Sequence, residues 1–245
     1  DAGPDGQFET GTFEDSENHS FGTSAKQLSV ADLNNDGILD LVTARFETGL
    51  VVSLGQDTEG STFGAPTNYT VGSEPGFNAI GDFNGDGIPD VAVTNRASDD
   101  VSVLLGNVNA TFKEVRTLAV GDFPQEIRTG DINKDGHLDL VVANMNDNSL
   151  ALLLGIGDGN FNTPTHHSSG GLGPTGVMII DLNQDGSLDV VTANTGPSGG
   201  DDHVGVLLGN GDGTFDTVQA YPVNKNPFSV TAADFNNDGI LDLAS

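Results

Sequence analysis

Short apolar runs separated by glycine, asparagine and aspartate follow one another along the whole chain. Four such runs stand in one stretch, at residues 77–83, 91–95, 101–106 and 112–120. Valine, isoleucine, leucine, threonine and phenylalanine dominate these runs, which is typical of β-strands. No window shows the sustained 3.6-residue period and the caps of an amphipathic helix. The pattern therefore predicts an all-β protein with almost no helix.

The pattern has a period of about 50 residues. One acidic phrase, D-x-N-x-D-G-x-x-D, begins at Asp32, Asp82, Asp131, Asp181 and Asp234, at intervals of 50, 49, 50 and 53 residues. A turn that ends in phenylalanine keeps the same phase, at Phe13, Phe63, Phe112, Phe161 and Phe215. A fixed period of this length indicates one supersecondary unit per repeat. Four-stranded sheets at this period favour a β-propeller-like array of blades, and a flat solenoid stack is the alternative.

The repeats predict a single domain over residues 1–245, with four complete repeats from residue 28 to 223 and a partial one. A lone strand at 13–22 and two strands at 228–236 and 241–245 are left over, which together make a blade without its third strand. The chain is therefore a fragment of a larger propeller, a unit completed head to tail by its neighbours, or a small ring with one defective blade. Because an unpaired strand edge is a template for another chain, we expect head-to-tail association into filaments if the chain is complete.

The charge of the chain narrows the classes of function. There are 36 acidic residues against eight basic ones, which gives a net charge of −28. Such a surface repels phosphate backbones, and no apolar stretch approaches the 18 or more residues of a membrane span, so we expect neither nucleic-acid binding nor membrane insertion. The absence of cysteine excludes disulfides and thiol chemistry. The remaining explanations are a halophile's surface and a binder of hard cations.

The acidic phrase has the chemistry of a calcium loop. Its aspartates at positions 1, 5 and 9, its asparagine at position 3 and the backbone carbonyl at position 7 can converge, and Gly at position 6 permits a sharp bend. Such a set of hard oxygen donors suits Ca²⁺ better than Mg²⁺. The phrase matches the start of an EF-hand loop, but position 12 is Thr43 rather than Glu, so position 9 is expected to close the site.

The alternative explanation of a single copy is an Asp/Asn/Gly turn that caps a hairpin. Five copies favour the cation, because three carboxylates in one loop repel each other unless a cation lies between them. We therefore expect one Ca²⁺ in each phrase. The predicted ligands, in the order of positions 1, 3, 5, 7 and 9, are Asp32, Asn34, Asp36, Ile38 and Asp40; Asp82, Asn84, Asp86, Ile88 and Asp90; Asp131, Asn133, Asp135, His137 and Asp139; Asp181, Asn183, Asp185, Ser187 and Asp189; and Asp234, Asn236, Asp238, Ile240 and Asp242.

This phrase inside a β repeat of about 50 residues resembles the FG-GAP (VCBS-type) repeats of integrin α-subunit propellers and of many secreted bacterial proteins. The resemblance covers residues 8–245, and residues 63–66 read FGAP. It implies a propeller, typically of seven blades, with calcium in a hairpin loop of each blade. It also implies a secreted or cell-surface protein that serves in adhesion, in glycan binding or as a module attached to an enzyme. This chain has too few repeats for seven blades.

Together these features favour an extracellular, calcium-stabilised structural or adhesion protein without catalysis, whose partner is itself or an extracellular protein or glycan. A carbohydrate-binding module is the alternative, although the chain has no Trp and only two Tyr on which a sugar ring could stack. The glycine-rich loops 168–176 and 195–203 are the expected place for a ligand. The non-catalytic part of a secreted enzyme is a third class, since the one G-x-S-x-G match, at 196–200, lies in a glycine-rich insertion rather than in a strand-to-helix elbow.

Overall fold

The computed structural model describes residues 25–56, 62–196 and 202–245. All of the regular structure in these residues is β-strand, as predicted, and the strands are numbered β1 to β18 in chain order. The predicted strand at 13–22 lies outside the described residues. None of the described residues forms a helix that could span a membrane.

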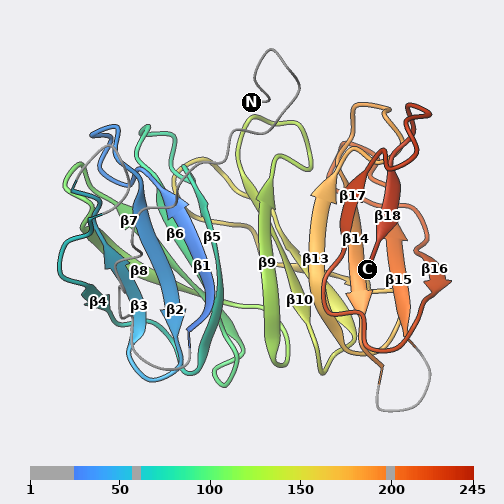
Figure 1. The fold of residues 1–245 in the computed structure, drawn as a ribbon, viewed down its shortest axis with the longest axis horizontal. Coiled ribbons are helices and arrows are strands. Elements are labelled where there is room, and N and C mark those ends of the chain that lie inside the picture. The colour runs from blue at the N-terminus through green and yellow to red at the C-terminus, as the bar shows by residue number, and fades with distance from the viewer. Residues whose placement is uncertain (1–24, 57–61, 197–201) are drawn as a thin grey trace, which may run out of the picture.

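Four of the repeats each fold into one antiparallel sheet whose four strands follow the chain order (Figure 1). A fifth, two-stranded sheet follows them, so the prediction of four complete repeats and a partial one is confirmed. The strands of the five sheets are β1 (Ala25–Ala31), β2 (Asp40–Arg45), β3 (Gly49–Ser53) and β4 (Thr67–Tyr69); β5 (Pro75–Gly81), β6 (Asp90–Asn95), β7 (Asp100–Gly106) and β8 (Phe112–Ala119); β9 (Pro124–Gly130), β10 (Asp139–Asn144), β11 (Ser149–Leu153) and β12 (Thr165–Ser168); β13 (Pro174–Ile180), β14 (Asp189–Asn194), β15 (His203–Leu207) and β16 (Gln219–Pro222); and β17 (Thr231–Ala233) with β18 (Asp242–Ala244).

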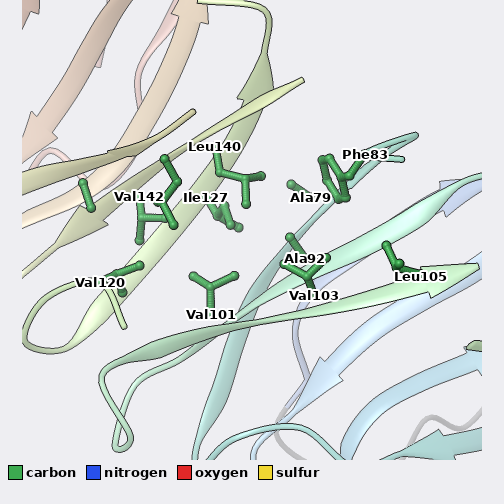
Figure 2. Packing of buried hydrophobic residues seen from close by; sticks show 12 residues of the cluster. Ala79, Phe83, Ala92, Val101, Val103, Leu105, Val120, Ile127, Leu140 and Val142 are labelled. Atoms are coloured by element: carbon green, nitrogen blue, oxygen red, sulfur yellow. The ribbon is translucent and has the colours of Figure 1, made fainter. Parts of the chain in front are cut away.

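The hydrophobic core lies between the sheets rather than within any one repeat. In the second sheet, Val91 and Val93 of β6 pack toward the first sheet, and Ala92 packs toward the third. Figure 2 shows the layer between the second and third sheets, where Ala92 and Val103 face the side of Leu140 and Val142. Because side chains alternate between the faces of a strand, an inner strand is buried on both sides and reads as an unbroken apolar run.

The first strands of successive sheets also neighbour one another, since β5 contacts β9 and β9 contacts β13. Sheets that pack face to face and share such a line of inner strands are the blades of a propeller-like fold. The repeat thus places every structural element, including the acidic phrase, at an equivalent position in each blade.

The two ends of the array leave apolar side chains uncovered among the described residues. Leu28 and Val30 of β1 are each 57% exposed, while Ile127, which matches Leu28 in the third repeat, is fully buried. At the other end Phe235 is 58% exposed, while Phe83 at the same repeat position is 2% exposed. The inner copies are buried because a neighbouring sheet covers them.

Candidate metal centre

Each acidic phrase forms the loop between the first and second strands of its repeat. We call these acidic loops 1 to 5, comprising residues 32–40, 82–90, 131–139, 181–189 and 234–242. In loop 1 the pairing of Ala31 with Asp40 closes the turn between β1 and β2, and the equivalent pairs close the others. All five loops therefore emerge at the same end of their sheets.

Two residues of every loop have left-handed backbone conformations. Gly37 at position 6 has φ of 84°, and the other glycines at that position are similar, which confirms the sharp bend expected there. Position 4 is left-handed as well, with φ of 58° at Asn35, 59° at Lys134 and 61° at Gln184. The strain at position 4 was not predicted, because Lys and Gln do not favour this conformation.

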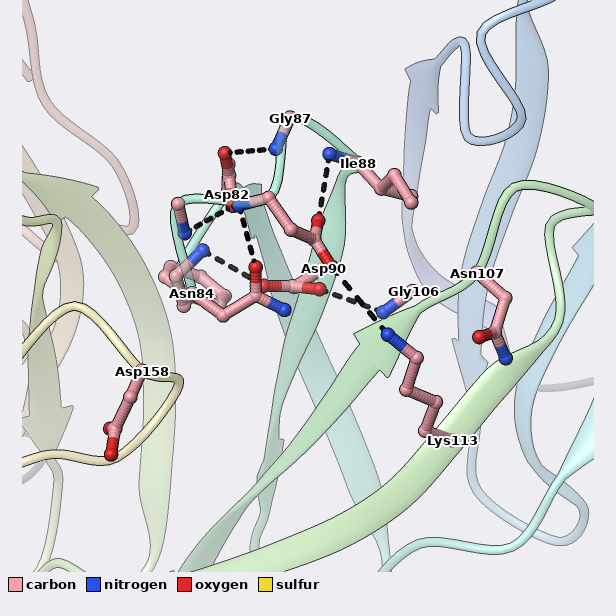
Figure 3. A network of polar contacts seen from close by, with 12 residues as sticks. Asp82, Asn84, Gly87, Ile88, Asp90, Gly106, Asn107, Lys113 and Asp158 are labelled. Atoms are coloured by element: carbon pink, nitrogen blue, oxygen red, sulfur yellow. Dashed lines mark hydrogen bonds and ion pairs between the residues drawn. The ribbon is translucent and has the colours of Figure 1, made fainter.

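Positions 1, 3 and 5 gather their side-chain oxygens around the backbone of their own loop. In loop 1 the N–H of Asp36 donates to Asp32 Oδ1 (3.0 Å) and to Asn34 Oδ1 (3.1 Å). The N–H of Gly37 donates to the second oxygen of Asp32 (2.7 Å), and that of Ile38 donates to Asp36 Oδ1 (2.8 Å). The same four contacts recur in the other loops, and Figure 3 shows them in loop 2.

The aspartate at position 9 has a structural role that the sequence did not reveal. Asp90 is fully buried, and its carboxylate accepts the N–H of Phe83 at position 2 (2.8 Å) and that of Gly106 at the end of β7 (2.7 Å). Asp90 thus joins the loop to the third strand of its sheet, and we call this pair of contacts the tie. A Cβ at Gly106 would lie 2.3 Å from the carbonyl oxygen of Pro89, so only glycine fits opposite the tie. The glycine that recurs at or just after the end of each third strand (Gly55, Gly106, Gly155 and Gly209) was the available signal for this contact.

The tie recurs in the complete repeats. Asp40, Asp139 and Asp189 are also fully buried and accept two backbone N–H groups each. Burial raises the pKa of Asp40, Asp90 and Asp139, while the backbone N–H groups act in the opposite direction by stabilising the charged form. Asp242 in the partial repeat accepts the N–H of Phe235 (3.1 Å) and lies partly exposed.

The donor set of each loop fits a hard cation by its chemistry. All of its donors are oxygens, and a carboxylate that accepts one or two N–H groups retains lone pairs for a cation. Among the described residues, however, no three carboxylate or imidazole groups lie close enough together to hold a metal ion as they stand. The hydrogen-bonded turn is complete by itself, so a cation would require the carboxylates at positions 1, 5 and 9 to turn toward one point.

Two loops have a lysine beside their carboxylates. Lys113 Nζ lies 3.5 Å from Asp86 Oδ2 in loop 2. In loops 1, 3 and 4 the matching oxygen instead accepts the amide of position 3. In loop 4 the N–H of Ser187 holds the pKa of Asp185 below its usual range, and the charge of Lys134 adds to this effect. The five loops are therefore not electrostatically equivalent.

The other predicted ligand region lies partly outside the described residues. The start of the loop 195–203 lies against the loop 168–176, since the N–H of Thr195 donates to the carbonyl of Gly173 (3.0 Å). Most of the G-x-S-x-G match at 196–200 is outside the described part of the chain. Nothing in the described part of these two loops specifies a ligand.

Comparisons with known proteins agree with this architecture. The model of the FG-GAP-like repeat matches residues 82–142, 131–192 and 181–245. No curated protein matches the chain. Among solved structures, a lectin of Agrocybe aegerita, described as recognising non-reducing terminal N-acetylglucosamine, is 21% identical with a TM-score of 0.56, and the match covers 90% of this chain and 60% of the lectin.

Two further solved structures have the same fold. A protein from Lactobacillus plantarum is 14% identical with a TM-score of 0.62, and the match covers 84% of this chain and 57% of that protein. A functionally unknown protein from Desulfotomaculum acetoxidans is 16% identical with a TM-score of 0.58, and the match covers 81% and 57%. The chain spans about three-fifths of the length of these structures. Since the family model matches three successive repeats across more than half of the residues, the chain belongs to the FG-GAP-like repeat family.

Proposed function

We propose that this chain is a calcium-stabilised, non-catalytic repeat module of a secreted or cell-surface protein, with a structural or adhesive role. The observation that carries the proposal is the fivefold recurrence of one all-oxygen loop, with the same hydrogen bonds, at the same end of every sheet. Calcium is the cation whose ligand number and flexible geometry suit such a loop. The ion would be held by positions 1, 3, 5 and 9 and by the carbonyl of position 7.

The net charge supports the same proposal. A surface with 36 acidic and eight basic residues repels itself, and the acidic loops concentrate that repulsion at one end of the sheets. Each bound Ca²⁺ would offset two negative charges where they are most crowded. In a calcium-rich medium outside the cell such a module would be stabilised by the ion it meets there.

Calorimetric titration of the chelator-treated chain with CaCl₂ tests the proposal. We expect close to one Ca²⁺ for each acidic loop, and we expect the double substitution Asp131→Ala with Asp135→Ala to lower that number by one. Asp99→Ala with Asp100→Ala is the control for the loss of two negative charges, since Asp99 lies in the β6–β7 turn and Asp100 is the first residue of β7, so neither belongs to an acidic loop. An absence of binding at millimolar calcium in the folded wild-type chain would contradict the proposal.

We propose that the uncovered faces of the first and last sheets mediate head-to-tail self-association. The outer face of β1 presents Leu28 and Val30, and the last sheet leaves Phe235 exposed, although the matching residues Ile127 and Phe83 are buried between sheets inside the array. The two ends are therefore the two halves of an interface that the chain already forms three times between complete sheets. We propose a second copy as the occupant.

Sedimentation velocity in calcium tests this association. The wild-type chain should form concentration-dependent oligomers, and Leu28→Ser with Val30→Ser should convert them to monomers. Val108→Ser is the control, because Val108 is 74% exposed in the β7–β8 hairpin of the second sheet and does not lie on β1 or in the last sheet. A wild-type chain that stays monomeric at tens of micromolar rules out self-association and favours covering of these faces by further repeats.

Carbohydrate binding is the alternative function. It is favoured by the lectin that shares the fold and by a shallow pocket lined by residues 223–229 and Ser245, in which Phe228 is 64% exposed. An exposed ring beside polar side chains is the usual platform for a sugar. A glycan array that includes terminal N-acetylglucosamine, probed with the wild-type chain and Phe228→Ala, decides this point: binding lost in the variant supports it, and no binding at all dismisses it.

A further inference from the structure

The side chain at position 4 of an acidic loop reaches the next acidic loop. Asn35 Nδ2 of loop 1 donates to the carbonyl of Gly87 in loop 2 (3.0 Å). Gln184 Nε2 of loop 4 donates to the carbonyl of Gly239 in loop 5 (3.0 Å). Lys134 Nζ of loop 3 donates to Ser187 Oγ in loop 4 (3.1 Å). Three pairs of neighbouring loops are therefore joined by the same position, although the three residue types differ.

The group that accepts each contact also positions a predicted cation ligand. The carbonyl of Gly87 belongs to the same planar peptide unit as the N–H of Ile88, and that N–H donates to Asp86 Oδ1 (3.0 Å). In loop 5 the peptide unit after Gly239 orients the carboxylate of Asp238 in the same way, through an N–H contact of 2.8 Å. Position 4 of one loop thus acts on position 5 of the next through a single peptide unit.

Loop 4 reaches the same result through a side chain. Lys134 holds the hydroxyl of Ser187, and the N–H of Ser187 donates to Asp185 Oδ1 (2.7 Å). Ser187, which accepts the hydrogen bond from the preceding loop, is therefore also the residue whose N–H donates to the position-5 carboxylate.

We call this series of contacts from position 4 of one acidic loop to the next loop the relay. It is interrupted once. Position 4 of loop 2 is Gly85, which has no side chain to reach loop 3. The second and third repeats are joined here by the N–H of Gly159, which donates to the carbonyl of Phe83 (2.9 Å) and touches none of the predicted ligands of loop 3. Loop 3 is therefore not connected to loop 2 by this route.

The backbone gives independent support for a role of these side chains. Lys134 and Gln184 adopt φ of 59° and 61°, a conformation that glycine adopts freely and other residues at a cost. Gly85 at the same position of loop 2 shows that glycine fits the loop, with φ of 72°. A strained Lys or Gln where glycine fits indicates that the side chain itself contributes something.

We propose that Asn35, Lys134 and Gln184 are positioning residues that couple calcium binding between neighbouring acidic loops. The five loops then act as two blocks, loops 1 and 2 and loops 3 to 5, separated at Gly85. This inference rests on the proposed function. An ion bound in one loop fixes the backbone from which its position-4 side chain projects, and that side chain presets the position-5 carboxylate of the next loop. Since one such hydrogen bond changes an equilibrium by roughly fivefold, we expect coupling of that order.

Site-resolved NMR titration of the full chain with CaCl₂ tests the coupling. The N–H of the position-6 glycine donates to the first aspartate of its own loop, so the amide signals of Gly37, Gly87, Gly136, Gly186 and Gly239 report the five loops separately. The test variants are Asn35→Gly and Gln184→Gly, which remove the side chain and keep a residue suited to the left-handed backbone. Asn237→Gly is the matched control, because it makes the same change in loop 5, the last of the five acidic loops.

We expect Asn35→Gly to raise the calcium midpoint at Gly87 about fivefold and to leave the midpoint at Gly136 unchanged, because the relay stops at Gly85. Gln184→Gly should do the same at Gly239, and Asn237→Gly should move no midpoint outside loop 5. The coupling is overturned if Gly87 titrates within twofold of wild type in Asn35→Gly, or if all five midpoints move together. Wild-type glycine signals that ignore calcium would instead refute the proposed function.

Discussion

At the scale of single residues, the buried aspartate that closes each loop matters most for local structure. Both oxygens of Asp90 accept backbone N–H groups away from water. In Asp90→Asn only one oxygen remains, so one buried N–H loses its acceptor, which costs about 1–3 kcal/mol. We expect the free energy of unfolding in saturating calcium, measured with urea, to fall by about 1–3 kcal/mol.

The control for this prediction is Asp242→Asn in the partial repeat. Its carboxylate accepts the N–H of Phe235 and is partly exposed, so water can replace a lost contact and the loss should be smaller. Equal losses in the two variants would show that burial of the tie is not what makes Asp90 important.

Lys113 is the second residue whose effect can be stated in advance. Its ammonium lies 3.5 Å from Asp86 Oδ2, beside the place where a divalent ion would bind in loop 2. At about 5 Å in water, repulsion between a single and a double charge is about 1–2 kcal/mol, or roughly tenfold in affinity. Lys113→Gln should therefore lower the calcium midpoint at Gly87 by up to about tenfold. Lys225 lies in the β16–β17 connection, so Lys225→Gln should leave the calcium midpoint at Gly87 unchanged. A shift of this midpoint in both variants would mean that only the net charge of the chain matters, and not the position of Lys113.

At the scale of elements, the inner strands depend on both of their neighbours. Leu140 of β10 is fully buried in the layer between the second and third sheets. Leu140→Ala leaves a cavity there, and such substitutions cost about 2–5 kcal/mol. We expect a clear fall in the melting temperature, measured by circular dichroism at low protein concentration.

Leu28→Ala makes the same substitution on the outer face of β1, where Leu28 is largely exposed. In the monomer this variant should melt within a few degrees of wild type, because the side chain gives up little buried area. A loss as large as that of Leu140→Ala would mean that the β1 face is covered even in the isolated chain.

At the scale of the whole molecule, calcium should act as a folding ligand rather than as a switch. A ligand that binds only the folded state adds about 2.7 kcal/mol per site at a hundredfold excess over its Kd, so five sites total roughly 13 kcal/mol. That is comparable with the whole stability of a typical domain. Removal of calcium with EDTA should lower the melting temperature by tens of degrees. A melt that is identical in EDTA and in millimolar calcium would show that the hydrogen-bonded turns suffice.

Much of the architecture was determined by the sequence alone, because each repeat is specified by residue types that lie close together in the sequence. Short apolar runs rich in β-branched residues specify strands, glycine specifies the sharp bend at position 6 of each acidic loop, and the 50-residue period specifies equivalent sheets. The donor types at positions 1, 3, 5 and 9 were evident for the same reason, since they lie within nine consecutive residues. The family also follows from this local pattern.

Only the tertiary structure decided the contacts that join distant segments. The tie from Asp90 to Gly106 spans 16 residues, and the relay from Asn35 to Gly87 spans 52. Such contacts depend on how sheets stack, because the stacking determines which backbone group faces which side chain. The same holds for Leu28 and Ile127, which share a repeat position but differ in burial because a preceding sheet covers only the second. A repeat pattern specifies what each unit is, whereas its place among its neighbours decides what each residue touches.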